Sequence, residues 1–257
     1  VVYNVPEVNE IVAKWKDPDY LESRLGKTTR YRSETSEDNH FMYWRSTNKR
    51  SKYKDRDGNP WKPPTGSTHV TFAEWLKIAV TGQNVSLEDR RHVYFRVSAM
   101  NTFGENRWLF DELKMFQPKK SLFIVDPDEQ RGIHCRFGMK SIIAESHFDG
   151  SRNFAGCFGG MRRWILNHPK ECGNMYLLPR NHPSGRHSEV DWSKPDLVKY
   201  PRFASLQANE IITKAGDMLY IPTDWFHYII SLTVNYQCNT RSGITRDYSS
   251  YIKKCGF

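Results

Sequence analysis

The sequence lacks long hydrophobic runs and any segment that resembles an export signal. None of its 257 residues lies in a run of 18 or more apolar residues, and the start of the chain has no basic segment followed by an apolar one. A transmembrane helix needs about 20 apolar residues in succession, and a signal peptide needs an apolar core after a basic start. We therefore expect no membrane span, no membrane partner, and a cytoplasmic or nuclear location.

Cysteine is scarce and irregularly spaced. The five cysteines are far apart, form no C-x-x-C pair and are odd in number. Small disulfide-stapled proteins and zinc ribbons need closely and regularly spaced cysteines. The pattern therefore argues against both classes and favours a reducing compartment.

Long helical patterns are missing beyond about residue 120, where short apolar segments alternate with glycine, proline and asparagine. No internal repeat is evident either. Many short strands without long intervening helices predict a β-sandwich or barrel. The expected strands lie at 121–126, 133–148, 153–158, 162–167, 174–179, 210–214, 218–222 and 227–239.

The first third of the chain has a mixed pattern. Apolar residues at helical spacing predict helices at 8–15 and 71–80, and the second begins with a Thr-x-x-Glu capping box. Residues 92–99 alternate as in a strand, and residues 109–116 predict a short helix.

Positive charge predominates, with a formal net charge of +9. Much of the excess lies in residues 45–66, which hold seven lysines or arginines against two aspartates. Such a segment is either a solvated loop or a guide for an acidic partner, which can be nucleic acid or an acidic protein segment. Charge alone does not choose between these interpretations.

The segment AESHFDGSRNFAG (144–156) holds a histidine and an aspartate two residues apart, in a stretch with the pattern of a strand. Side chains alternate between the faces of a strand, so His147 and Asp149 point the same way. The pair can be a structural hydrogen bond, an acid–base pair, or two ligands of a metal.

A third ligand is available in the segment KAGDMLYIPTDWFHYIISL (214–232). This segment predicts a turn, a short buried strand, and His227 at the start of the next strand. Two histidines and one carboxylate form the facial triad that binds non-haem Fe(II) and leaves positions open for substrate and O2. We therefore predict a metal site formed by His147, Asp149 and His227.

Three features together resemble the JmjC oxygenases: the H-x-D pair, the block GDMLYIPTDWFH, and the insert NHPSGRHSEVDWSKPDLVKYPRF at 181–203. Within that family the sequence is most similar to the asparaginyl hydroxylases that inhibit hypoxia-inducible factor. The resemblance implies a mainly β fold, a double-stranded β-helix of the jelly-roll or cupin type, with flanking N-terminal helices. We expect an N-terminal mixed α/β region at 1–119 that packs on a barrel core at 120–257, together forming one structural domain.

The resemblance also implies Fe(II) as the metal, 2-oxoglutarate as co-substrate and O2 as oxidant. Arg162 takes the position of a lysine that pairs with the far carboxylate of 2-oxoglutarate, and its alternation with Trp164 favours the barrel interior. Tyr94 matches a tyrosine whose hydroxyl reaches the same carboxylate. Asn153 and Asn235 match two asparagines that line the iron pocket.

On the substrate side, Tyr43, Arg186 and His187 fall where the asparaginyl hydroxylases present groups to their target. His187 replaces a glutamine that reads the target amide, so specificity for asparagine does not follow from the resemblance.

The resemblance implies a hydroxylase that acts on a protein side chain, with succinate and CO2 as co-products. Three alternatives stay open: an N-methyl-lysine demethylase, an RNA (tRNA) hydroxylase with the same chemistry, and a non-catalytic cupin that binds a partner through residues 45–66. The pattern leaves the oligomeric state undefined.

Overall fold

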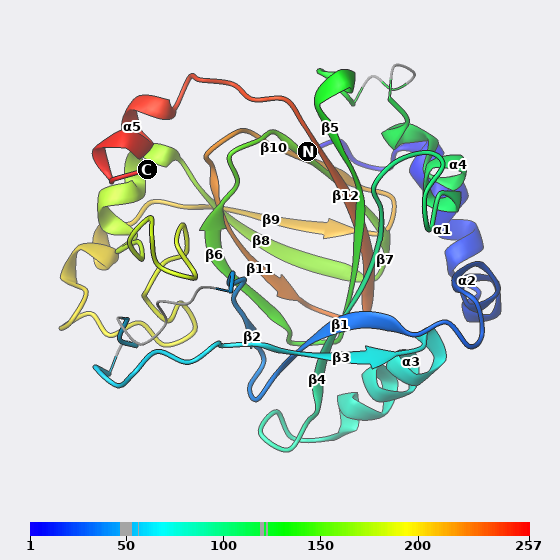
Figure 1. Ribbon diagram of the computed structural model, residues 1–257, viewed down its shortest axis with the longest axis horizontal. Coiled ribbons are helices and arrows are strands. Elements are labelled where there is room, and N and C mark those ends of the chain that lie inside the picture. Colours follow the sequence, from blue (N-terminus) through cyan, green and yellow to red (C-terminus); the bar gives the residue numbers. More distant parts are fainter. Residues whose placement is uncertain (47–52, 56, 119–120, 122) are drawn as a thin grey trace.

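The computed structural model contains two β-sheets flanked by helices (Figure 1), and it describes residues 1–46, 53–55, 57–118, 121 and 123–257. The α-helices are α1 Pro6–Trp15, α2 Pro18–Leu25, α3 Phe72–Thr81, α4 Trp108–Glu112 and α5 Ser249–Lys254. The 3-10 helices are η2 Gly82–Asn84, η3 Lys114–Phe116, η4 Pro127–Glu129, η5 Pro169–Asn174 and η6 Pro201–Ser205. Helices α1 to α4 lie along one side of the molecule, and α5 lies at the opposite end.

The strands form a seven-stranded and a five-stranded sheet. The strands are β1 Tyr31–Ser36, β2 His40–Phe41, β3 Gly66–Val70, β4 His92–Ala99, β5 Gln130–Gly138, β6 Ile143–Phe148, β7 Asn153–Gly159, β8 Met161–Asn167, β9 Asn209–Lys214, β10 Met218–Ile221, β11 Phe226–Ser231 and β12 Asn235–Ser242. The larger sheet has the order β10-β7-β12-β5-β4-β1-β3, and the smaller one has the order β2-β6-β11-β8-β9.

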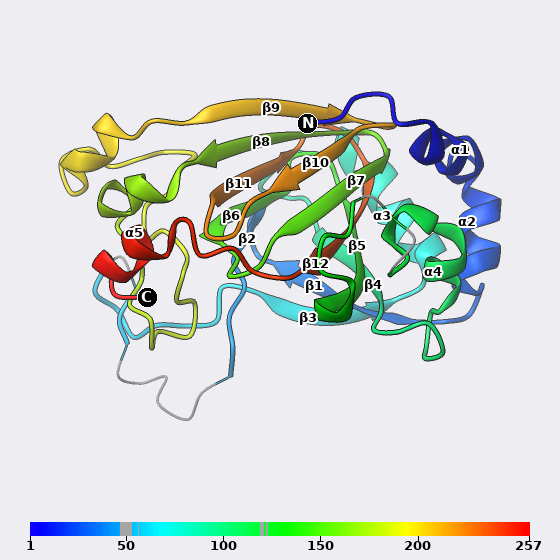
Figure 2. The ribbon, with the colours of Figure 1, turned by 90° about the horizontal axis from the view of Figure 1, so that it is seen from above.

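Almost all neighbouring strands are antiparallel, and only the short β2 pairs in parallel with β6 among the described strands. Figure 2 shows the edge strands β9 and β3 on opposite sides of the molecule. The side chains that line the central cavity come from both sheets. This arrangement confirms the expectation of a mainly β, cupin-like jelly roll with flanking N-terminal helices.

The helices cover the outer face of the larger sheet. In α3 the expected capping box is present, because Thr71 accepts from the Glu74 amide while Glu74 accepts from the Thr71 amide. The helix then buries Trp75 against Phe137 of β5, with the ring centroids 5.9 Å apart. Trp15 of α1 packs on the same phenylalanine at 5.8 Å. The main apolar core therefore lies between these helices and the sheet, and it leaves the other face of the sheet free to form a site.

Two of the expected strands are wrong, and two others, 133–148 and 227–239, each divide into two strands. The described residues of 121–126 form turns that lead into η4, and residues 174–179 form a turn with one isolated bridge, between Leu177 and Ser188. Both segments bury apolar side chains, such as Ile124 and Met175, without a neighbouring strand to pair with. A short apolar run indicates burial, but it does not distinguish a strand from another buried segment.

Four of the five cysteines are paired, which contradicts the expectation drawn from their spacing. Cys135 and Cys238 lie directly opposite each other on β5 and β12 and form a disulfide. Cys172 of η5 is bonded to Cys255, just after α5. Cys157 is free and buried. The pairing depends on which strands become neighbours, and spacing along the chain does not show this, so the cytoplasmic or nuclear location stays a prediction.

The N-terminal region shares both sheets with the barrel. Strands β1, β3 and β4 extend the larger sheet, and β2 joins the smaller one. The boundary at residue 119 stays a prediction. Among the described residues, every helix is too short or too polar to cross a membrane.

Candidate metal centre and cavity

The three predicted metal ligands come together at one end of the smaller sheet. His147 of β6 and His227 of β11 are directly opposite each other in an antiparallel pair, and Asp149 follows the end of β6. One possible ligand atom from each residue lies within 4.8 Å of the other two. The strand alternation that predicted a common face for His147 and Asp149 therefore agrees with the observed placement.

Each imidazole is oriented by a hydrogen bond to the backbone. Nδ1 of His147 lies 2.7 Å from the carbonyl oxygen of Glu145, and Nδ1 of His227 lies 3.1 Å from that of Trp225. Because a carbonyl oxygen only accepts, Nδ1 of each ring must donate, and Nε2 keeps its lone pair. Metal-ligating histidines are usually held in this way.

Asp149 divides its two oxygens between different partners. Oδ1 lies 3.1 Å from Nη1 of Arg241, whereas Oδ2 lies 3.9 Å from Nε2 of His227. Burial alone would raise the pKa of Asp149, but Arg241, the two imidazoles and Arg186 outweigh it and hold that pKa well below its usual range. The carboxylate is therefore ionised, with one oxygen available to a metal.

Burial has the opposite effect on the two imidazoles. It lowers the pKa of His147 well below the usual value, assisted by the nearby His227, and it lowers the pKa of His227 as well. Both rings are therefore neutral at physiological pH, as a metal ligand must be. Two neutral nitrogens and one carboxylate oxygen fit the donor set of a non-haem Fe(II) site.

A cavity of about 300 Å³ opens between the two sheets beside these ligands. Arg162 of β8 lies in its wall with no exposed surface, while Arg163 points outward and pairs with Glu210. The guanidinium of Arg162 donates to Asn235, to Gln237 at 2.7 Å and to the carbonyl of residue 136 at 2.8 Å. Among the residues that the structure describes, these three bonds leave two of its five N–H groups for a ligand.

Tyr94 and the two asparagines occupy different positions around Arg162. The Tyr94 ring centroid lies 5.5 Å from the guanidinium carbon of Arg162, and Tyr94 lines the cavity. Asn153 lines the cavity too and accepts a hydrogen bond from Asn239 at 2.9 Å. Asn235 lies beside the cavity rather than in its wall, and it orients Arg162.

The three predicted substrate residues all line the cavity. The His187 ring stacks on that of His147 with centroids 4.9 Å apart, and burial lowers the pKa of His187 to about 4, so it is neutral. Arg186 donates to the carbonyl of Phe148 at 3.2 Å and lies 3.6 Å from Oδ1 of Asp149. Tyr43 is 54% exposed at the rim.

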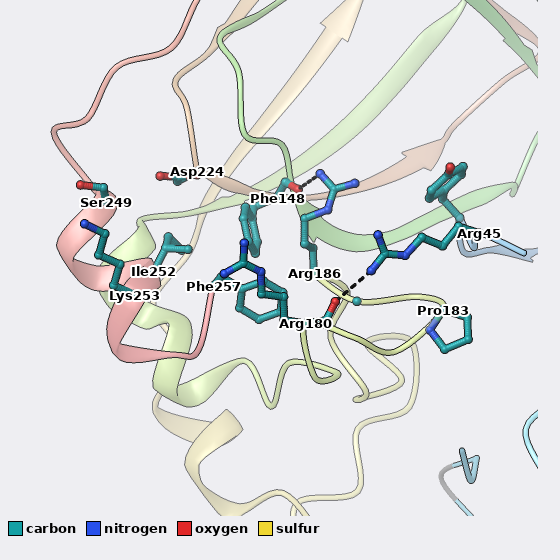
Figure 3. A pocket seen from close by; sticks show the side chains of 12 residues that line it. Arg45, Phe148, Arg180, Pro183, Arg186, Asp224, Ser249, Ile252, Lys253 and Phe257 are labelled. Atoms are coloured by element: carbon teal, nitrogen blue, oxygen red, sulfur yellow. Dashed lines mark hydrogen bonds between the residues drawn. The ribbon is translucent and has the colours of Figure 1, made fainter. Parts of the chain in front are cut away.

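A second cavity of about 470 Å³ adjoins the first, and we call it the outer pocket (Figure 3). Tyr43 and Arg186 line both cavities. The other cations of the outer pocket are Arg45, Arg180 and Lys253, and its apolar surface includes Phe257. An anionic group that enters the metal cavity from this side would pass these cations.

Sequence reasoning missed Arg241 and Gln237, which contact Asp149 and Arg162. Both lie on β12, where residues 235, 237, 239 and 241 are all polar and alternate with Cys238 and Thr240. Polar residues at every second position of the strand that follows the His227 strand along the chain are the signal that would have indicated Arg241 and Gln237.

Residues 1–242 match the family model described as a cupin-like domain. The chain is 39% identical over 87 residues to tRNA wybutosine-synthesizing protein 5 of Gallus gallus, covering 34% of the chain and 26% of that protein. It is 31% identical over 125 residues to lysine-specific demethylase JMJ31 of Arabidopsis thaliana, covering 45% and 23%. It is 32% identical over 104 residues to JmjC domain-containing protein D of Dictyostelium discoideum, covering 40% and 23%.

The chain therefore spans about a quarter of the length of these curated relatives. The broader kinship, a cupin-like domain with JmjC proteins among its relatives, is established. The closer likeness to the asparaginyl hydroxylases stays a prediction.

Proposed function

Because the chain belongs to the family of cupin-like domains, we propose that it is an Fe(II)- and 2-oxoglutarate-dependent oxygenase that hydroxylates a C–H bond of its substrate. The observation that supports this most directly is the orientation of His147, Asp149 and His227. Their free ligand atoms lie close together while the other nitrogen or oxygen of each side chain is already bonded. A merely structural hydrogen-bonded pair would not need both imidazoles to be held with Nε2 free.

The chain's own residues have three tasks in this proposal. His147, Asp149 and His227 bind the metal, and Arg162 binds the far carboxylate of 2-oxoglutarate with its two remaining N–H groups, helped by Tyr94. The cavity walls, including Trp164 of β8, exclude water. Iron(II) bound there would supply the activation of O2 and couple the decarboxylation of 2-oxoglutarate to substrate hydroxylation.

A protein side chain is the first substrate class that we consider. His187 is neutral, and its Nδ1 lies 3.1 Å from the Ser184 carbonyl, to which it donates, so Nε2 can accept a hydrogen bond from a substrate N–H or O–H group. Together with Arg186 and Tyr43, which line the same cavity, this hydrogen bond to His187 would orient the substrate side chain toward the metal.

The names of two relatives, a lysine-specific demethylase and a tRNA wybutosine-synthesizing protein, point to other classes of substrate. Both remain candidate functions here, because hydroxylation of an N-methyl carbon or of a nucleoside uses the same iron chemistry. A non-catalytic cupin is disfavoured, since a partner-binding module has no use for a buried arginine with free donors next to three converging ligands.

The test is an anaerobic titration of the protein with Fe(II) and 2-oxoglutarate, followed by the visible charge-transfer absorption of the chelate. We expect a band in the native protein and its loss in His147→Ala. Asn167→Ala, in β8 at a buried position outside the cavity, serves as a comparison for general destabilisation. Metal binding without a band in the native protein would overturn the co-substrate assignment and favour a binding module.

A further inference from the structure

Four neighbouring strands place a row of arginines on the sheet face that continues from the metal cavity. These are Arg32 of β1, Arg96 of β4, Arg136 of β5 and Arg241 of β12, and we call them the arginine face. Strand register puts them on one side, because Glu34 is opposite Tyr94, Arg96 is opposite Arg136, and Arg136 is opposite Gln237. All of these side chains line the cavity or the groove next to it.

The arginine face has too few carboxylates to balance it. Among the described residues that line the two cavities, Glu34 and Asp149 are the only acidic ones. Glu34 pairs with Arg96, and Asp149 pairs with Arg241 through the oxygen that does not face the metal site. Arg136 has one long hydrogen bond, of 3.5 Å to Asn239. Like charges directly opposite each other in a sheet destabilise it. Arg136 is opposite Arg96, whose charge Glu34 balances, so Arg136 is the one of the two without a carboxylate partner among the described residues.

The metal cavity adjoins both a groove and the outer pocket on the side where Tyr43 lies. A cavity of about 730 Å³ extends the face outward from Arg96 past Arg32, and it shares Glu34, Tyr43 and Arg96 with the metal cavity. Tyr43 also lines the outer pocket, where Arg45, Arg180 and Lys253 continue the positive charge (Figure 3). The groove and the outer pocket also share Arg45, so a chain-like anion can run through both of them past the metal cavity, with cations on either side of Tyr43.

The polarity of the face distinguishes between two kinds of anionic chain. Between the arginines it presents the polar side chains of Ser98, His134 and Asn239. Val97 also borders the groove, and the rings of Phe41 and Tyr94 line the metal cavity. Protein interfaces have an apolar core in which a few large side chains provide most of the affinity. Nucleic-acid interfaces are more polar and far more positive. The exposed ring of Tyr43 at the junction is the kind of surface on which a base stacks.

We propose that the arginine face binds the phosphodiester backbone of a single-stranded nucleic acid and directs one nucleotide into the metal cavity. Guanidinium groups match phosphate geometry with two parallel hydrogen bonds, and this favours arginine over lysine at such a site. That the nucleotide is then hydroxylated rests on the proposed function, whereas the binding itself does not.

The experiment is fluorescence anisotropy of labelled oligouridylate and oligothymidylate, each of about 12 nucleotides, with the full chain at several salt concentrations. Arg32 and Arg136, the two arginines of the face without a carboxylate partner among the described residues, predict a slope of log K against log salt of about −1.4, since each contributes about −0.7 on single strands. Arg32→Gln and Arg136→Gln should each weaken binding about tenfold, because each removes a charge-assisted hydrogen bond. Each should also reduce the slope by about 0.7.

The matched control is Arg163→Gln, which removes an arginine from the outward side of β8, where it pairs with Glu210. We expect this variant to bind like the native protein. Arg32 is exposed, so Arg32→Gln keeps the test valid if Arg136→Gln fails to fold. Tighter binding of oligouridylate would identify RNA as the ligand, and equal binding would identify the shared phosphodiester chain; both support the proposal.

Three results would overturn it: no binding of either oligonucleotide, equal losses in Arg163→Gln and the face variants, or equally strong competition by polyglutamate. The last would assign the face to an acidic peptide. The charge-transfer titration is independent of all three, so a protein that binds nucleic acid but forms no chelate would refute the proposed function and leave this proposal standing.

Discussion

Nη1 of Arg241 lies 3.1 Å from Oδ1 of Asp149, the oxygen of that carboxylate that does not approach His227. The arginine comes from the larger sheet and the aspartate from the end of a strand in the smaller one, so this contact joins the two walls of the cavity. It leaves Oδ2 as the oxygen that can bind a metal, and it keeps the carboxylate ionised.

Replacing this arginine should make metal binding sensitive to acid. Arg241 counteracts the burial that would otherwise raise the pKa of Asp149. In Arg241→Gln that pKa should rise, so protonation of Asp149 competes with the metal at a higher pH. We expect the Fe(II) or Mn(II) affinity of the variant to fall increasingly below that of the native protein as the pH is lowered from 8 toward about 4, the usual pKa of an aspartate, with little difference near pH 8.

Anaerobic metal titrations across this pH range would measure the effect. Arg163→Gln, which also removes one positive charge but far from the metal, is the control. Equal metal affinities of Arg241→Gln and the native protein at low pH would contradict the role given to Arg241.

Arg162 should govern co-substrate affinity without affecting the metal. Arg162→Gln removes the buried charge from the cavity and should weaken 2-oxoglutarate binding about a hundredfold, as expected when one partner of a buried charge pair is removed. Arg162→Lys restores the charge but cannot reach Gln237 and Asn235 together, so it should recover only part of the affinity. Equilibrium titrations of Fe(II) and of 2-oxoglutarate separate the two effects. A parallel loss of Fe(II) affinity would mean that the substitution has disturbed the whole cavity.

The part of the site that could be predicted from the sequence is the part that depends on side chains alternating between the two faces of a strand. His147 and Asp149 are two residues apart in and after a strand, and Arg162 alternates with the buried Trp164, so each faces the interior. The period of two in a strand is a local property, and it needs no knowledge of the fold. The helix at 71–80 was predictable for the same reason, because its capping box and apolar spacing lie within ten residues.

The contacts that were missed depend on strand order. Arg241 reaches Asp149 only because β12, between β7 and β5 in the larger sheet, brings it opposite the end of β6 in the smaller sheet. Cys135 and Cys238 are 103 residues apart in the sequence and become opposite neighbours only when β5 pairs with β12. Pairing over such distances follows from the complete topology, and no pattern within one segment contains it.

The disulfide that joins η5 to the segment after α5 should stabilise the outer pocket. Cys172 and Cys255 enclose a loop of 83 residues, and Lys253 and Phe257, which line the pocket, lie within two residues of Cys255. Cys255→Ser should lower the free energy of unfolding by about 2–4 kcal/mol under oxidising conditions. Urea denaturation measures this, and dithiothreitol should remove most of the difference. If Cys255→Ser and the native protein are equally stable under oxidising conditions, Cys172 and Cys255 do not form a disulfide in the native protein, as the sequence had suggested.

His134 reports on the electrostatics of the arginine face. Its Nδ1 lies 3.0 Å from the Ser98 hydroxyl and its Nε2 lies 2.8 Å from the carbonyl of Arg131. Burial lowers its pKa to about 4, assisted by Arg136, Arg241 and Arg96. The folded protein therefore binds a proton at this site less readily than the unfolded chain, whose histidine titrates near 6.5. The contribution of neutral His134 to stability is fully present above about pH 6.5 and is lost as the pH falls toward 4.

Nucleic-acid binding should raise the lowered pKa of His134 part of the way back toward its usual value. A phosphate over the face offsets the charge of Arg136 and its neighbours, so the pKa of His134 should rise when oligouridylate binds. Nuclear magnetic resonance titration of the imidazole signals, with and without the oligonucleotide, measures the change, and His134→Asn assigns the signal. His182 lies outside this face and its pKa is lowered by burial alone, so its titration should not move. A His134 titration that stays the same in the bound complex would mean that the strand lies elsewhere on this basic protein.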